Sequence, residues 1–108
     1  MSKLVTSIGQ SLISGYVLYS CDKEWQTGYK LMKDGKDAFL TRWSPGSFYP
    51  LLNNLYKKKM LNKRKTKSNR ITYEYKTTNE GKKYLKNISN YFKNEIITDY
   101  ITYLMRWI

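Results

Sequence analysis

Residues 44–55, with the sequence SPGSFYPLLNNL, combine a strong helix start with a one-sided apolar pattern. Ser44 and Ser47 can both cap a first turn, and Pro45 takes a first-turn position where its missing amide hydrogen costs little. Three apolar residues then follow at the spacing of one buried helix face: Phe48, Leu52 and Leu55. The segment therefore predicts a helix that buries these side chains and leaves polar ones outside.

A basic segment and a strand-like alternation follow this helix. Residues 71–76, ITYEYK, alternate with a period of two and include β-branched and aromatic members, which predicts a strand. Pairing with residues 62–65 would make a hairpin, and residues 66–69 supply suitable turn residues at its tip.

Two helices are expected before residue 44. From Ser2 to about Cys21, apolar residues recur every three or four positions, which predicts a first helix. A second, short helix would start after the cap residue Thr27 and end near Gly35, with residues 34–37 forming a loop.

A long helix is expected after the hairpin. Thr77 with Glu80 fits a capping box, and Thr78 is nearly as good a cap. Apolar residues then recur by threes and fours for about seven turns, which predicts a continuous helix over residues 78–108. Such a helix is longer than a small domain is wide, so its distal half needs a partner.

The charge of the chain is strongly positive and unevenly distributed. Its 108 residues include 20 Lys and Arg against eight Asp and Glu, and no acidic residue occurs from Ala38 to Tyr73. A high total charge is compatible with a solvated cationic surface, whereas segregated charge creates a local field that favours a polyanion. We therefore expect nucleic acid as the partner.

Several classes of protein are excluded by what the chain lacks. With no histidine, one cysteine and scattered carboxylates, it cannot assemble the usual metal site or catalytic triad, so we expect no metal, no cofactor and no enzyme activity. No run approaches the roughly 18 apolar residues of a membrane span, and the first residues lack the apolar core of a signal peptide. A cytoplasmic, nucleoid-associated protein of a prokaryote, phage or plasmid is expected.

Three stretches resemble the PadR family of transcriptional regulators. They are GYKL at residues 28–31, SPGSFYPLLNNL at residues 44–55, and Tyr73–Tyr75 followed by Thr78 and Gly81. The resemblance covers most of the chain from Gly28 to Leu85 and implies a dimeric repressor that binds a palindromic operator. A single terminal helix is typical of the short members of that family. Some of those accept a planar aromatic effector at the dimer interface, which we do not predict here.

The expected fold is mostly α with a small β-hairpin. Residues 1–77 would form a winged helix-turn-helix DNA-binding region, and residues 78–108 a long C-terminal dimerisation helix, within one compact domain overall. Helix and wing would supply the DNA contacts: Ser44, Ser47, Tyr49, Asn53, Asn54, Lys57, Arg64, Lys65, Lys67 and Arg70. Asparagine can make two hydrogen bonds to adenine, and hydroxyls and cations reach phosphates. The competing interpretation is an ordinary capped surface helix beside a solvated basic loop.

The aromatic and aliphatic stripe of the last helix is expected to form the dimer core. Its members are Ile88, Phe92, Ile96, Tyr100, Tyr103 and Trp107. Stacking of a planar ligand or of RNA bases on this stripe is the alternative.

The sequence thus predicts a sequence-specific regulator of transcription that binds double-stranded DNA, a repressor acting on a palindromic operator as a homodimer. Two other classes stay open. One is a structural or partition protein that coats repeated sites on plasmid or phage DNA, or a DNA-binding adaptor. The other is a module that binds acidic proteins or anionic lipid.

Overall fold

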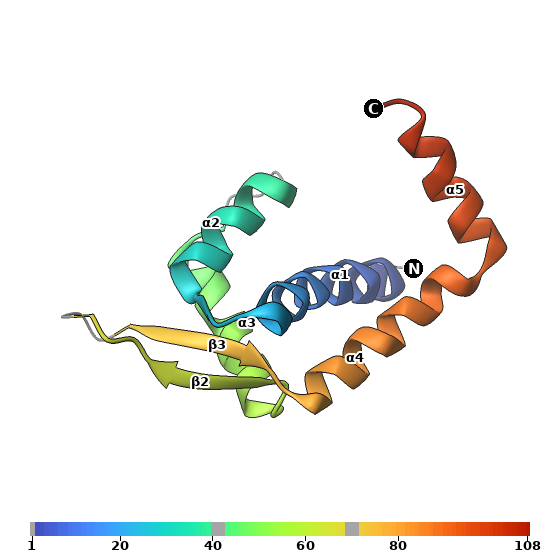
Figure 1. Cartoon of the computed structure of the whole chain (residues 1–108). Helices are drawn as coiled ribbons and strands as arrows, with labels where there is room; N and C mark the ends of the chain where they lie inside the picture. The colour runs from blue at the N-terminus through green and yellow to red at the C-terminus, as the bar shows by residue number, and fades with distance from the viewer. Residues whose placement is uncertain (1, 40–42, 69–71) are drawn as a thin grey trace.

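The computed structural model describes residues 2–39, 43–68 and 72–108, with side chains from residue 10 onward except that of Phe39. In chain order the elements are α1 (Ser2–Lys23), β1 (Gln26–Thr27), α2 (Gly28–Phe39), α3 (Pro45–Lys57), β2 (Leu61–Lys65), β3 (Tyr73–Thr77), α4 (Asn79–Ser89), the 3₁₀ turn η1 (Asn90–Lys93) and α5 (Glu95–Met105). Figure 1 shows α1, α2 and α3 packed beside a projecting hairpin, with α4 running along α1 and α5 leading away from the body. The expected winged helix-turn-helix with a C-terminal helical region is confirmed. Among the described helices, none is long and apolar enough to cross a membrane.

The core lies between the first three helices and the sheet. Its buried members are Val17, Leu18, Cys21, Leu31, Phe48, Leu52, Leu55, Leu61 and Tyr75. The three α3 residues predicted to face inward are therefore all buried, as expected from their spacing. Burial also raises the pKa of the Cys21 thiol to about 12, so this cysteine is a packed apolar side chain rather than a reactive thiolate.

The sheet has three antiparallel strands in the order β1–β3–β2. The predicted hairpin is confirmed, with Leu61 opposite Thr77 and Lys65 opposite Tyr73. The third strand, β1, pairs Gln26 with Tyr75 and has only two residues, too few for a periodic pattern in the sequence. Because successive side chains of a strand point to opposite faces, Tyr75 faces the helices while its neighbour Glu74 faces away.

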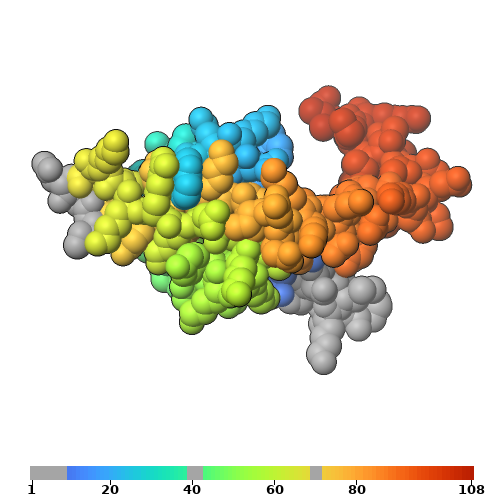
Figure 2. Space-filling view, turned by 60° about the horizontal axis from the view of Figure 1, so that its bottom comes forward, coloured from blue at the N-terminus to red at the C-terminus, as the bar shows by residue number. Residues whose placement is uncertain are grey.

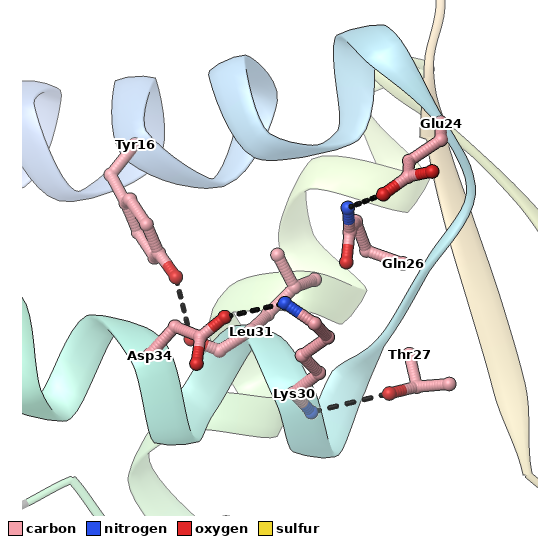
Figure 3. Close-up of polar contacts among 7 residues, drawn as sticks. All are labelled: Tyr16, Glu24, Gln26, Thr27, Lys30, Leu31 and Asp34. Carbon is pink, nitrogen blue, oxygen red and sulfur yellow. Dashed lines mark hydrogen bonds and ion pairs between the residues drawn. The ribbon is translucent and has the colours of Figure 1, made fainter.

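The joint between α1 and α2 is held by polar contacts that Figure 3 shows. The predicted cap is confirmed, because the Lys30 amide donates to Thr27 Oγ1 at 3.2 Å. One turn later, Lys30 Nζ pairs with Asp34 Oδ2 at 2.8 Å. The Tyr16 hydroxyl donates to the Leu31 carbonyl at 2.9 Å and so fixes the two helices to each other.

The predicted end of the second helix is wrong, since α2 continues through residues 34–37 to Phe39. Gly35 is a buried residue inside the helix and not its C-cap. A Cβ at this position would overlap the ring of Trp43 and lie 2.7 Å from Cε2 of Tyr16. Gly35 is therefore explained by the close approach of two aromatic rings and not by the left-handed conformation of a helix end.

Replacing Gly35 by alanine is expected to lower the free energy of unfolding by about 1–3 kcal/mol, because the added methyl group overpacks this contact. The control is Gly46→Ala, also within a helix, where an added Cβ meets nothing closer than Ser44 Oγ at 3.8 Å. That change is expected to stabilise the protein by about 0.5–1 kcal/mol through helix propensity. Urea denaturation of both variants measures the difference, and effects of the same sign would contradict the packing role of Gly35.

The fourth helix is capped by Thr78, so the predicted capping box at Thr77 is wrong. Thr78 Oγ1 accepts from the Gly81 amide at 3.1 Å, and the same hydroxyl donates to the Lys59 carbonyl at 2.6 Å. Thr77 is instead buried and donates to the Leu18 carbonyl at 2.6 Å. Its hydroxyl thus ties β3 to α1 across the core, which local sequence cannot reveal.

The predicted continuous helix over residues 78–108 is also wrong, because the chain turns at Asn94. This residue is extended, with φ −76° and ψ 127°, and its side-chain oxygen accepts from the amides of Ile96 and Ile97 at 2.9 and 3.4 Å. Asparagine competes in this way with helical hydrogen bonds and favours caps over helix interiors. The C-terminal region is therefore two helices, α4 and α5, joined by η1.

Candidate nucleic-acid interface

The face of α3 opposite its buried side chains carries the residues that we predict to contact DNA. All six are exposed: Ser44, Ser47, Tyr49, Asn53, Asn54 and Lys57. The helix begins as expected, with Ser44 extended at φ −111° and ψ 164° and Pro45 in the first turn. In Figure 2, α3 in light green lies next to the strands of the hairpin in yellow-green on one face of the molecule.

Some polar side chains of α3 and its cap make hydrogen bonds within the chain, and others make none among the described residues. The Ser44 amide donates to Ser47 Oγ at 3.0 Å, and the Ser47 hydroxyl donates to the Ser44 carbonyl at 3.1 Å, so both serines hold the helix start. Among the described residues, no hydrogen bond involves the side chains of Asn53 and Asn54. The two asparagines thus present unused amide groups on the outer face of α3.

The hairpin of β2 and β3, which we call the wing, has Arg64 fixed on its outer face. Arg64 Nε pairs with Glu74 Oε1 at 3.0 Å, and the two residues are direct cross-strand partners. The guanidinium also lies 4.0 Å from the ring centroid of Trp25, just before β1. Arg64 is therefore oriented by a carboxylate and an aromatic ring within its own chain.

On the inner face of the wing, Lys63 bridges the wing to α3. Its Nζ lies 4.3 Å from the ring centroid of Tyr73 and 5.0 Å from that of Tyr56, near the end of α3. The ammonium group is thus held over two aromatic rings between the predicted recognition helix and the wing.

Two more of the predicted wing cations, Lys65 and Lys67, point into solvent. Lys65 and Lys67 are exposed, and in the part of the chain that the structure describes they take part in no ion pair or ring contact. At the base of the turn, the Thr66 amide donates to the Thr72 carbonyl at 2.9 Å. The predicted contact residue Arg70 and the predicted turn residue Asn69 lie outside the described residues.

The six residues predicted for dimerisation fall into two groups. Ile88 is half-buried within its own chain. Its side chain packs on α1 at Gly15, where an added Cβ would lie 2.9 Å from Ile88 Cδ1. Phe92 and Tyr100 line an apolar pocket of about 200 Å³ beside Leu12. The others point outward, with exposures of 77% for Ile96, 53% for Tyr103 and 76% for Trp107.

The sequence indicates Lys63 as one cation of the basic segment, but neither its position over Tyr56 and Tyr73 nor the contribution of Trp25. Arg64 faces Glu74 in the observed register, whereas a cross-strand count from the predicted turn at residues 66–69 would have placed residue 71 opposite Arg64. The rings beneath the two cations come from other elements, and no local pattern indicates them.

Solved structures share this fold over nearly the whole chain. A PadR-like transcription factor from Bacteroides fragilis aligns with a TM-score of 0.71 and 17% identity, covering 94% of this chain and 98% of that one. A PadR-like regulator from Bacillus cereus gives 0.69 and 22%, covering 95% and 96%. The Thermoplasma acidophilum protein TA0346 gives 0.73 and 23%, covering 94% and 96%.

The family of the chain follows from its sequence rather than from these distant structures. No curated protein matches significantly in sequence. The model of the transcriptional regulator PadR-like family matches residues 17–87, from the middle of α1 to the last residues of α4. This match covers more than half of the chain and includes α3 and the wing. The protein therefore belongs to the PadR-like family of transcriptional regulators, whose members bind DNA and are not enzymes.

Proposed function

We propose that this protein is a repressor that binds a palindromic operator in double-stranded DNA as a homodimer. The observation that carries the proposal is the outward apolar face of α5 and of the turn after it, where Ile96 and Trp107 are about three-quarters exposed. A contiguous apolar face of this kind is costly in water and marks an interaction site. A second copy is the simplest partner, because a two-fold axis gives each half of a palindrome its own recognition helix.

Each element has its own task in this proposal. The exposed side chains of α3 read base edges in the major groove, and Asn53 and Asn54 are the foremost candidates because their amide groups are unused. The cations of the wing neutralise phosphates, with Lys65 and Lys67 more available than Arg64. Residues 1–77 would bind DNA, and residues 78–108 would form the dimer. The protein would act in the cytoplasm, where prokaryotic DNA lies.

The decisive experiment is selection of bound fragments from the DNA of the host or genetic element at physiological salt, followed by footprinting. An isolated palindrome is the expected result. A long run of direct repeats would indicate a protein that coats an array, and the absence of any sequence preference would point to an acidic protein or an anionic lipid as the partner.

Asn53→Ala and Lys67→Ala are expected to impair binding in different ways. Asn53 lies on the outer face of α3, so its loss should relax base preference at one position of each half-site, by about 1–3 kcal/mol for a two-bond contact. Lys67 lies on the wing, so its loss should weaken binding to all sequences alike and reduce the salt dependence. Binding to a panel of single-base operator variants at several salt concentrations separates the two, and identical effects would contradict this division.

A further inference from the structure

A groove lined by four tyrosines lies between the starts of α2 and α3 and strand β3. It has a volume of about 250 Å³, and we call it the tyrosine groove after its lining residues: Thr27, Gly28, Tyr29, Tyr49, Thr72, Tyr73 and Tyr75. Figure 1 shows the start of α2 beside β3. The groove thus lies between the two elements to which we assign the DNA contacts, α3 and the wing.

The shape of the groove depends on a close approach of α2 to α3. A Cβ on Gly28 would lie 2.7 Å from Cε1 of Tyr49 and 3.2 Å from Cδ1 of Leu52, so the Tyr49 ring packs directly on the backbone at the start of α2. The alternation of β3 adds Tyr73 and Tyr75 from the other side. Three elements therefore fix the rings before any ligand binds.

The tyrosine hydroxyls in the groove have no acceptor among the residues that the structure describes. In the described part of the chain, the hydroxyls of Tyr49, Tyr73 and Tyr75 form no hydrogen bond, whereas that of Tyr16 donates to a carbonyl. Tyr75 is 7% exposed. Among the described residues, every fully buried side-chain nitrogen or oxygen atom has a hydrogen-bond partner. The Tyr75 hydroxyl has none among them, so it must reach the surface of the groove. A hydroxyl at the groove surface without a partner among the described residues is available to donate to a ligand that accepts hydrogen bonds.

The surroundings of the groove favour an anion. Lys63 Nζ lies 4.3 Å from the ring centroid of Tyr73, and the nearest wing carboxylate, Glu74, is on the opposite face of the sheet and bound by Arg64. Burial, and to a smaller extent the neighbouring Tyr49 and Tyr73 side chains, raise the pKa of Tyr75. Its hydroxyl therefore stays protonated and able to donate at physiological pH.

We propose that the tyrosine groove binds the sugar-phosphate backbone of DNA, with the hydroxyls of Tyr73 and Tyr75 donating to phosphate oxygens and Lys63 supplying positive charge. The inference rests on the proposed function for its ligand and adds residues outside the contact set derived from α3 and the wing cations. Tyrosine hydroxyls commonly contact phosphate and carry no base information. A backbone held here would set the depth at which α3 enters the major groove.

The test uses Tyr73→Phe and Tyr75→Phe in the full chain, with Tyr19→Phe as the matched control. Tyr19 is exposed on α1 with Lys23 near its ring, and so pairs a tyrosine with a cation away from the groove. Each groove variant should bind the selected operator about 10-fold more weakly, the loss expected for a hydrogen bond to a charged group. The salt slope should stay unchanged, because a neutral hydroxyl releases no counterion, and neither base preference nor melting temperature should move.

Methylphosphonate substitution, one phosphate at a time, identifies the contact directly. One phosphate in each half-site should be sensitive in the wild type and insensitive in the Tyr73→Phe/Tyr75→Phe double variant. Unchanged affinity of both phenylalanine variants, with a wild type that binds its operator specifically, overturns the inference and leaves the proposed function intact. A wild type without sequence preference overturns the proposed function itself, together with the inference.

Discussion

Raising the salt concentration from about 50 to about 200 mM is expected to weaken the complex with the operator by roughly 10³- to 10⁵-fold. This range corresponds to a dimer that neutralises about 6–10 phosphates and releases their counterions. The structure supports such a footprint, because Lys57, Lys65 and Lys67 are exposed without ion pairs among the described residues and Lys63 lies between the wing and α3. Fluorescence anisotropy with a labelled operator at four or more salt concentrations gives the slope.

Removing lysines inside and outside the wing, and comparing the effect per lysine, tests whether the wing carries this salt dependence. The double variant Lys65→Gln/Lys67→Gln should reduce the slope of log affinity against log salt concentration by about one for each lysine removed from each copy in the dimer. Lys86→Gln is the control, because Lys86 is exposed on α4 outside the proposed interface. A flat salt response of the wild type, or a control that lowers the slope as much per lysine as the wing variant, would contradict electrostatic binding through the wing.

Placing glutamates on the outward face of α5, as in Ile96→Glu/Tyr100→Glu, is expected to abolish specific operator binding while nonspecific attraction to DNA persists. Ile96 is 77% and Tyr100 is 57% exposed, and the two are one turn apart, so the charges disrupt an interface between copies. Within one chain, the cost falls on the apolar pocket that Tyr100 lines beside Leu12. Without the dimer, two recognition helices are no longer held about one DNA turn, roughly 34 Å, apart.

The matched control for this variant is Thr98→Glu/Thr102→Glu. These threonines are also exposed and one turn apart on α5. Within the described part of the chain, their hydroxyls bond only to backbone carbonyls of α5 and of its cap residue Asn94. Light scattering should find a dimer for the wild type and the control, and a monomer for Ile96→Glu/Tyr100→Glu. A variant that stays dimeric, or a monomeric wild type that binds half and full operators equally well, contradicts the model.

Local sequence by itself determined the features that depend on neighbouring residues. The start of α3, its buried face and the presence of a hairpin after it follow from cap residues and from periods of 3.6 and 2, which act within one or two turns of chain. The register of the hairpin does not, because the turn predicted at residues 66–69 would have paired Lys65 with residue 70 and not with Tyr73. The exposed asparagines of α3 and the cations of the wing belong to the same class, because the opposite face of each element is identified by its apolar residues. The resemblance to the PadR family likewise depends on contiguous motifs, and the family match confirms it.

Only the tertiary structure decided the features in which distant segments compete for one residue. Gly35 has the chemistry of a C-cap but is needed where Trp43 and Tyr16 meet, and Thr77 could cap a helix but bonds to α1 instead. Lys63 becomes part of a site only because Tyr56 and Tyr73 arrive from two other elements. In each case the residue has two possible local uses, and packing against a partner far away in sequence selects one of them.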